Sequence, residues 1–236
     1  LLESGVTRVS LGVQSFHDHE LVRLGRAHTG DQARTAIAAI RAAGCINLSI
    51  DLMLWLPGQS SADCMASVDE MVALSPDHAS LYMLELYPNA PLREEMARGG
   101  WSLAPDEDGA AMYLDALART DRAGYEQYEI SNVCRPGWHS RHNLKYWQDG
   151  SWIGFGCGAH STQEGARWKN TSETVSYVET IERGEFPAVG RRRLSARERL
   201  GDAVFTGLRL VEGIDVDVLG RRYNTDLRAQ FGPKLQ

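Results

Sequence analysis

The first 130 residues alternate between two hydrophobic patterns. Runs in which every second residue is apolar predict β-strands, and segments with apolar residues three or four positions apart predict amphipathic helices. The predicted strands span 8–14, 46–54, 79–86 and 126–130. The predicted helices between them span about 29–44, 60–74 and 106–122, each ending near a glycine or a proline. Strands that alternate with helices are typical of βαβ units, so we expect an α/β fold with a parallel sheet.

Polar residues occupy one face of this predicted sheet. Gln14 closes the first strand, and Ser49 and Asp51 face away from the apolar side of the second. A flat sheet with helices on both faces would bury these groups, whereas a barrel-like sheet turns one face toward a cavity. The pattern therefore favours an open or partial barrel. With Arg26, these residues would offer an amide, a guanidinium and a carboxylate to a polar ligand, although a single glutamine at a strand end is often structural.

The pattern changes after residue 130. Residues 131–170 are rich in Gly, Trp, His and Asn and have no clear period, which is typical of a loop region that forms a site. A helix is predicted at 173–183, another begins at the Ser195–Glu198 capping box, and a short one follows at 216–223. We therefore expect three regions: a partial barrel over 1–130, a loop region over 131–190, and the start of a helical domain over 191–236.

Composition and charge narrow the class of protein. The chain has 25 basic and 31 acidic residues and a net charge of −6, which argues against a nucleic-acid-binding surface. The one basic run, Arg191 to Arg193, is interpreted as a solvated turn. No apolar stretch reaches the roughly 18 residues of a membrane span, and no signal peptide is visible, so we expect a cytoplasmic protein. Four cysteines without a CxxC pair are interpreted as thiols of a reducing compartment: Cys45, Cys64, Cys134 and Cys157.

Five motifs, taken in order, resemble those of the HemN/HemW family of radical SAM proteins. They are GVQSF at 12–16, LGR at 24–26, IDL at 50–52, LPGQ at 56–59 and YEISN at 128–132. The resemblance covers essentially the whole chain. It implies the second half of a partial (β/α)6 barrel followed by the start of a small C-terminal helical domain. It also implies that the chain is a fragment, with the family's CxxxCxxC motif for a 4Fe–4S cluster lying upstream of residue 1.

The same resemblance implies a binding site for S-adenosylmethionine. The residues that match the family's cofactor-binding positions are Gln14, Arg26, Asp51, Glu85, Ala159 and His160. The last three are expected to contribute their backbone, and the LELYP sequence around Glu85 departs from the more usual pattern. The glycine-rich segment 154–161 lets backbone approach a ligand closely. None of the four cysteines replaces the cluster motif, so we expect no metal ligands within the chain.

The HNLKYW sequence at 142–147 resembles the HNxxYW signature of the heme-chaperone branch of the family. It implies that heme is bound, with His142 as an axial ligand to the iron and with Tyr146 and Trp147 against the porphyrin edge. Without the resemblance, the residues alone favour another interpretation, in which His142 and Asn143 cap a turn and Tyr146 and Trp147 fill the core. The branch implies a chaperone that passes heme to acceptor proteins, which include acceptors at a membrane.

Two other functions stay open at this point. The first is an enzyme of the same family, the oxygen-independent coproporphyrinogen III dehydrogenase, which uses a 5′-deoxyadenosyl radical to start the decarboxylation of propionate side chains. The second belongs to a different class, a catalytically silent interaction module. The HNLKYW sequence favours the chaperone over the dehydrogenase.

Overall fold

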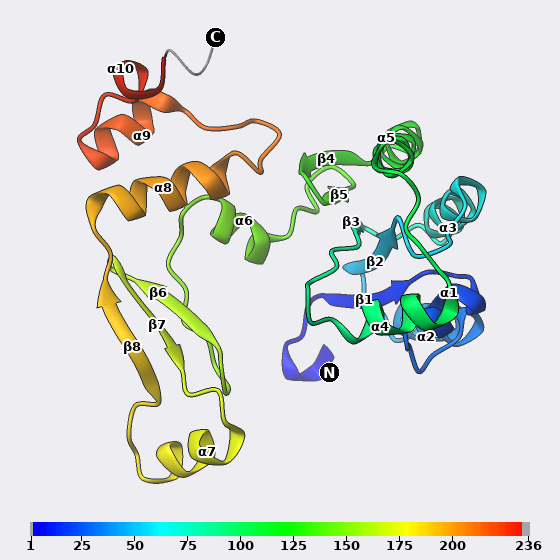
Figure 1. Ribbon diagram of the computed structural model, residues 1–236, viewed down its shortest axis with the longest axis horizontal. Helices are drawn as coiled ribbons and strands as arrows, with labels where there is room; N and C mark the ends of the chain where they lie inside the picture. Colours follow the sequence, from blue (N-terminus) through cyan, green and yellow to red (C-terminus); the bar gives the residue numbers. More distant parts are fainter. Residues whose placement is uncertain (1, 233–236) are drawn as a thin grey trace. The chain divides into compact units, whose positions relative to one another are not determined.

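The computed structural model describes residues 2–232. The chain divides into two compact units, Leu1–His139 and Ser140–Gln236 (Figure 1). The first unit contains most of the predicted strand–helix alternation, and the second contains the segment without a clear period and the C-terminal helices.

The first unit is built around a five-stranded sheet with the order β1-β2-β3-β5-β4. Strands β1 (Val9–Gln14), β2 (Leu48–Leu54) and β3 (His78–Met83) are parallel, as the sequence predicts. Strands β4 (Glu126–Glu129) and β5 (Asn132–Cys134) depart from the predicted parallel sheet. Strand β5 lies between β3 and β4 and is antiparallel to both. The predicted strand 126–130 thus belongs to a hairpin. Its partner β5 has three residues, too few to show a period.

Three long helices, α2, α3 and α5, cover one face of this sheet (Figure 1). Leu48, Ile50 and Leu52 point toward them from β2 and are fully buried. Ile46, which the sequence places in the same strand, precedes β2 and is 71% exposed. The helical elements of the unit are η1 (Leu2–Ser4), α1 (Asp18–Arg23), α2 (Gly30–Ala42), α3 (Ser61–Ala73), α4 (Pro91–Gly99) and α5 (Asp106–Arg122).

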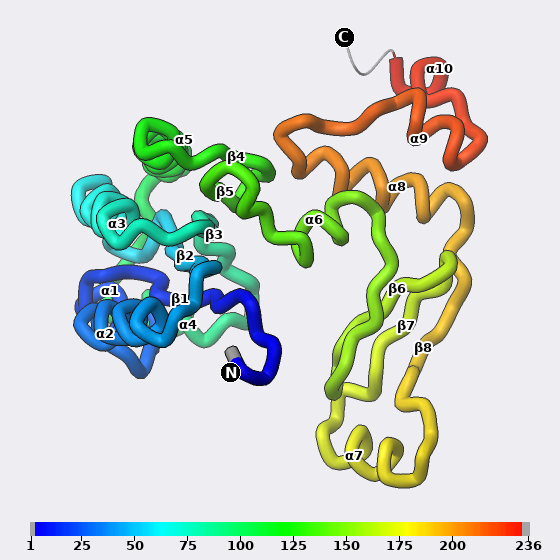
Figure 2. Tube along the Cα trace, turned by 180° about the vertical axis from the view of Figure 1, so that it is seen from behind, coloured from blue at the N-terminus to red at the C-terminus, as the bar shows by residue number. Residues whose placement is uncertain are grey.

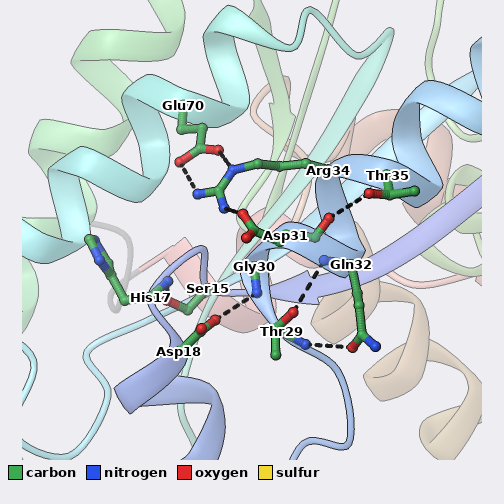
Figure 3. Close-up of polar contacts among 10 residues, drawn as sticks. All are labelled: Ser15, His17, Asp18, Thr29, Gly30, Asp31, Gln32, Arg34, Thr35 and Glu70. Atoms are coloured by element: carbon green, nitrogen blue, oxygen red, sulfur yellow. Dashed lines mark hydrogen bonds and ion pairs between the residues drawn. The ribbon is translucent and has the colours of Figure 1, made fainter.

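Figure 3 shows how the first turn of α2 is fixed. Gln32 N donates to Thr29 Oγ1 at 3.2 Å and Thr29 N donates to Gln32 Oε1 at 2.9 Å, which is a complete capping box. Arg34 on the same helix donates to both carboxylate oxygens of Glu70 on α3, at 2.5 and 2.9 Å. This two-point contact ties neighbouring helices together and fixes their register.

The second unit contains a three-stranded antiparallel sheet with the order β6-β7-β8 (Figure 2). Its strands are β6 (His160–Gln163), β7 (Ala166–Asn170) and β8 (Ala188–Arg193), with α7 (Thr174–Glu182) between the last two. Segment 131–170 therefore holds regular structure, in strands too short to give a periodic signal. The interpretation of Arg191 to Arg193 as a turn is wrong: they end β8, an edge strand whose last five residues are exposed.

Helices complete the second unit. They are α6 (Arg141–Trp147), α8 (Ala196–Gly207), α9 (Val216–Tyr223) and α10 (Leu227–Phe231). The predicted capping box opens α8, and a small apolar cluster joins α8, α9 and α10 through Leu200, Leu219 and Leu227. Within residues 2–232, no helix combines the length and apolar character needed to cross a membrane.

Candidate functional site

The polar positions of β1, β2 and β3 lie side by side on the face of the sheet opposite the buried aliphatic side chains of β2. The strand register pairs Gly12 with Asp51 and Asp51 with Ser80. Ser10 Oγ donates to Asp51 Oδ1 at 3.0 Å, and Ser49 Oγ donates to the same oxygen at 3.4 Å. Asp51 is half-buried, and among residues 2–232 no hydrogen bond reaches its Oδ2. That oxygen is therefore open to a ligand.

Gln14 ends β1 in a conformation that few residues other than glycine adopt. Its φ is 68°, and the register between β1 and β2 shifts between Gly12 and Gln14. The side chain is 7% exposed, and its Oε1 accepts a hydrogen bond from the Tyr82 hydroxyl at 2.7 Å. A non-glycine residue in this region stores strain, so the contacts around Gln14 must hold it there.

Gly12 provides the space in which Gln14 and Arg26 meet. A Cβ atom added at Gly12 would lie 2.7 Å from Gln14 Nε2 and 3.7 Å from a guanidinium nitrogen of Arg26. The first distance is a clash, so any larger residue at position 12 would displace the Gln14 amide. The structure thus brings the side chains of Gln14 and Arg26 together beside Asp51, the register partner of Gly12.

Tyr82 is a member of this face that the sequence analysis missed. It follows Ser80 by two positions on β3, so its parity is that of the polar face. Burial raises the pKa of the Tyr82 hydroxyl, and the Asp51 charge raises it further. The hydroxyl therefore stays protonated and donates to Gln14. A tyrosine in an apolar strand resembles a core residue, and only its parity with Ser80 could have indicated this role.

A buried chain of hydrogen bonds continues from Asp51 across the sheet. Ser49 Oγ lies 2.9 Å from His78 Nδ1, and His78 Nε2 lies 2.8 Å from the Tyr128 hydroxyl. His78 is fully buried, and burial, with smaller contributions from neighbouring basic groups, lowers its pKa to about 3. The imidazole is therefore neutral near pH 7, with one donor and one acceptor nitrogen. It links Tyr128 to Ser49, which in turn contacts Asp51.

Glu85 lies beyond β3 and not within it. The sequence predicts a strand to residue 86, but β3 ends at Met83, opposite the last residue of β2, Leu54. Beyond that point, the Leu84 N–H donates to Leu54 O at 3.1 Å. Glu85 itself is exposed and accepts a hydrogen bond from the Tyr87 hydroxyl at 2.9 Å. Its carboxylate is therefore held by a neighbour in sequence, outside the sheet.

The glycine-rich segment 154–161 of the second unit folds against its own neighbours. Asn170 Nδ2 donates to Gly154 O at 3.1 Å, and a Cβ added at Gly154 would lie 2.4 Å from His160 O. The glycine thus serves a close internal approach of backbone to backbone. Ala159 is half-buried, and His160 is exposed at the first position of β6.

Helix α6 presents a row of rings. His142 is exposed and meets the Tyr146 ring edge-on at 4.9 Å, and Tyr146 meets the Trp152 ring at 4.7 Å. The Arg209 guanidinium lies 4.4 Å from the Trp147 ring, and Trp147 Nε1 is buried without a hydrogen-bond partner in the described part of the chain. Within the described residues α6 has no fully buried member, and Tyr146 and Trp147 are half-buried. The helix is capped by the residue before it, and His142 is left at the surface.

A cavity of about 240 Å³ lies beside these rings in the second unit, and Tyr146, Trp152, Arg199 and Tyr223 contribute to its lining. Sites for small molecules usually measure about 300–1,000 Å³. A porphyrin macrocycle is therefore too large to be enclosed there. A ligand on the His142 imidazole would instead be bound at the surface.

The cysteines do not form a cluster site. Cys45, Cys64 and Cys134 are buried and Cys157 is exposed. Burial raises the pKa of Cys64 to about 12 and that of Cys134 to about 11, so these thiols stay protonated, whereas iron–sulfur clusters are bound by thiolates. In residues 2–232 the one group of three potential metal ligands contains no cysteine. A 4Fe–4S cluster therefore does not fit the residues described.

Comparison with curated proteins finds relatives that share one name. No family model matches the chain. It is 34% identical over its whole length to the heme chaperone HemW of Bacillus subtilis, and 37% identical over 92% of its length to the heme chaperone HemW of Mycobacterium tuberculosis. The chain covers 62% and 56% of those two proteins, so it spans about three fifths of the length of these curated relatives.

Among solved structures, coproporphyrinogen III oxidase (HemN) from Escherichia coli, a radical SAM enzyme, has a similar fold. It matches 99% of this chain with a TM-score of 0.81 and 16% sequence identity, and the match covers 56% of the oxidase. At this identity the likeness shows a shared α/β fold.

Proposed function

Because the chain belongs to the HemN/HemW family of radical SAM proteins, we propose that the protein is a HemW-type heme chaperone, which binds heme and delivers it to acceptor proteins. The observation that carries the proposal is the 34% identity to the heme chaperone of Bacillus subtilis across the entire chain. The exposed His142 on an HNxxYW helix supports it. The likeness to the oxidase is one of fold and gives no separate support to the enzyme.

In this proposal the polar face of the first unit binds S-adenosylmethionine. Asp51 offers a carboxylate oxygen to ribose hydroxyls or to the amine, Arg26 a guanidinium to the carboxylate, and Gln14 an amide. These donor types fit the cofactor, and Gly12 keeps the space between them open. When bound, the cofactor supplies a sulfonium group whose reductive cleavage defines radical SAM chemistry. The thiolates of the 4Fe–4S cluster would come from outside this chain.

We also infer that the five strands form part of an incomplete barrel, with the polar face turned inward. The parallel β1, β2 and β3 and the hydrogen-bonded polar groups on one face support this. The backbone contacts of Glu85, Ala159 and His160 with the cofactor stay predictions of the sequence.

Heme is the cargo in this proposal, and α6 is where it would be bound. The exposed His142 offers an imidazole nitrogen to the iron, and its edge-on contact with Tyr146 fixes the plane of the ring. Tyr146 is the aromatic neighbour closest to this histidine. The Trp147 ring is already covered by the Arg209 guanidinium, so Tyr146 is the better candidate for a porphyrin contact.

Titration of the full-length protein with hemin, followed by the Soret absorption, tests the function. We expect His142→Ala to weaken binding at least tenfold or to change the spectrum of the bound heme. His160→Ala is the matched control, because it removes an exposed histidine from the same unit and keeps the backbone. Equal binding by both variants would contradict the assignment. Conversion of coproporphyrinogen III by the cluster-loaded protein would instead favour the dehydrogenase.

A further inference from the structure

A second group of chemically reactive side chains lies in the first unit, at the starts of α1 and α3. His19 and Glu20 belong to the first turn of α1, and Asp63 belongs to the first turn of α3. One ligand atom from each of the three lies within 4.8 Å of the other two. None of them takes part in the polar face that contains Asp51.

Glu20 is a buried carboxylate without a cation. Its side chain is fully buried, and its Oε2 accepts hydrogen bonds from Ser15 Oγ at 2.5 Å and from Gln59 Nε2 at 3.1 Å. Its Oε1 is buried and has no hydrogen-bond partner among the residues that the structure describes. Within residues 2–232, no ion pair includes Glu20. Buried charges are normally paired or bound to a metal, so this oxygen lacks the partner that its burial requires.

The other two ligands are available from the solvent side. Asp63 Oδ2 accepts a hydrogen bond from Ser60 Oγ at 2.7 Å, which leaves Oδ1 free within the described chain. His19 is exposed and makes no side-chain hydrogen bond in the part of the chain described. Its ring can therefore turn toward Glu20.

We propose that His19, Glu20 and Asp63 bind a divalent transition-metal ion, for which Zn²⁺ is the probe. One imidazole nitrogen and two carboxylate oxygens are ligands that Zn²⁺ takes in proteins, and three protein ligands leave a position for water. The ion supplies the positive charge that Glu20 lacks and satisfies its Oε1. The exposure of His19 provides the entry path.

The site has a direct connection to the polar face. Glu20 Oε2 holds the hydroxyl of Ser15, the residue that follows Gln14, and Figure 3 shows Ser15 and His17 on the turn between β1 and α1. A metal at Glu20 therefore stiffens the turn from which Gln14 takes its left-handed conformation. Metal binding itself does not depend on the proposed heme or cofactor function.

Calorimetric titration with Zn²⁺ tests the proposal, using the cluster-loaded full-length protein, in which the iron–sulfur cluster occupies the cysteines of the CxxxCxxC motif. The parent carries Cys157→Ser, because the exposed Cys157 thiol would otherwise compete for the ion. We expect His19→Ala and Asp63→Asn each to raise the dissociation constant of one ion per chain at least tenfold. The control Asp108→Asn, which neutralises an exposed carboxylate on α5, should change it less than twofold.

A thermal melt provides the second readout. Saturating Zn²⁺ should raise the melting temperature of the parent and of Asp108→Asn, and should leave that of His19→Ala unchanged. His19 is exposed, so its removal does not threaten the fold. Zn²⁺ binding of equal strength in the parent and in His19→Ala, or no binding by the parent, would show that the proposal is wrong.

Discussion

The two units of the chain place their polar chemistry differently. The first buries a large apolar core under one face of its sheet and carries a hydrogen-bonded polar network on the other, including the fully buried His78. In the second, the apolar cluster has four buried members within the described residues, and α6 and α7 have none. A network above a large core holds donors in fixed positions, which suits a bound cofactor. An exposed side chain such as that of His142 on α6 suits a ligand that arrives from and leaves to solvent.

The largest expected loss of stability tests the difference in size between the apolar cores of the two units. Ile50 is fully buried in the first unit, so Ile50→Ala should lower the free energy of unfolding by about 2–5 kcal/mol. Val175 on α7 is 61% exposed, and Val175→Ala should cost less than about 0.5 kcal/mol. Urea unfolding followed by circular dichroism measures both. Losses of similar size would remove the contrast between the units.

The second prediction concerns the buried imidazole of the first unit. The pKa of His78 is about 3 in the fold against an ordinary value of 6.5, so between these values the unfolded chain binds more protons. The free energy of unfolding should therefore fall as the pH drops below about 6.5, by at most about 1.4 kcal/mol per pH unit, and the contribution of His78 should be constant above it.

His78→Gln should flatten this dependence between pH 6.5 and about 5, and His160→Gln, at an exposed position of the second unit, should not. Denaturant unfolding at a series of pH values checks both. If the free energy of unfolding of His78→Gln still falls with pH as steeply as that of the parent, the neutral buried imidazole is not the cause of the dependence.

The third prediction separates ligand binding from stability on the polar face. Asp51→Asn should weaken S-adenosylmethionine binding by the cluster-loaded protein about tenfold, which corresponds to about 1.4 kcal/mol. The melting temperature should hardly change, because an amide oxygen can still accept the hydrogen bonds of Ser10 and Ser49. Ser10→Ala, which removes one of these bonds, should have a smaller effect on binding. Unchanged affinity in Asp51→Asn would exclude Asp51 as a ligand contact.

The smallest expected loss of stability concerns the capping box, a motif that begins one helix in each unit. Complete capping boxes begin α2 at Thr29 and α8 at Ser195, and Thr29→Ala and Ser195→Ala should each cost about 1 kcal/mol. If the units unfold separately, the smaller second unit should show the larger drop in melting temperature, because its unfolding entropy is smaller. Differential scanning calorimetry would resolve two transitions. A single transition moved equally by both changes would show that the units unfold as one.

The sequence predicts the elements that are long and regular. The alternation in 8–14 and 46–54 corresponds to β1 and β2, and the helical spacing over 106–122 corresponds to α5. The hairpin partner β5 and the strands β6 and β7 escape prediction because they have three to five residues each. A pattern of period two needs more positions than that to stand out.

The candidate site also contains some residues that the sequence predicts and others that it does not. The shared face of Ser49 and Asp51 follows from strand parity, which is a local property. The contributions of Tyr82 and His78 depend on the register between separate strands, which no single segment contains. A tyrosine or histidine within an apolar strand is typical of the core, so parity with Ser80 was the one local signal that these residues gave.

The antiparallel hairpin at the edge of the first sheet also bears on how this unit assembles. Strands β4 and β5 are joined by two residues, whereas each parallel pairing must wait for a whole intervening helix to form and pack. Hairpins close in about 1–10 μs, and contacts distant in sequence form more slowly. We therefore expect folding to proceed from the hairpin through β3 toward β1. Gln14, at the end of β1, would then reach its left-handed conformation among the last steps.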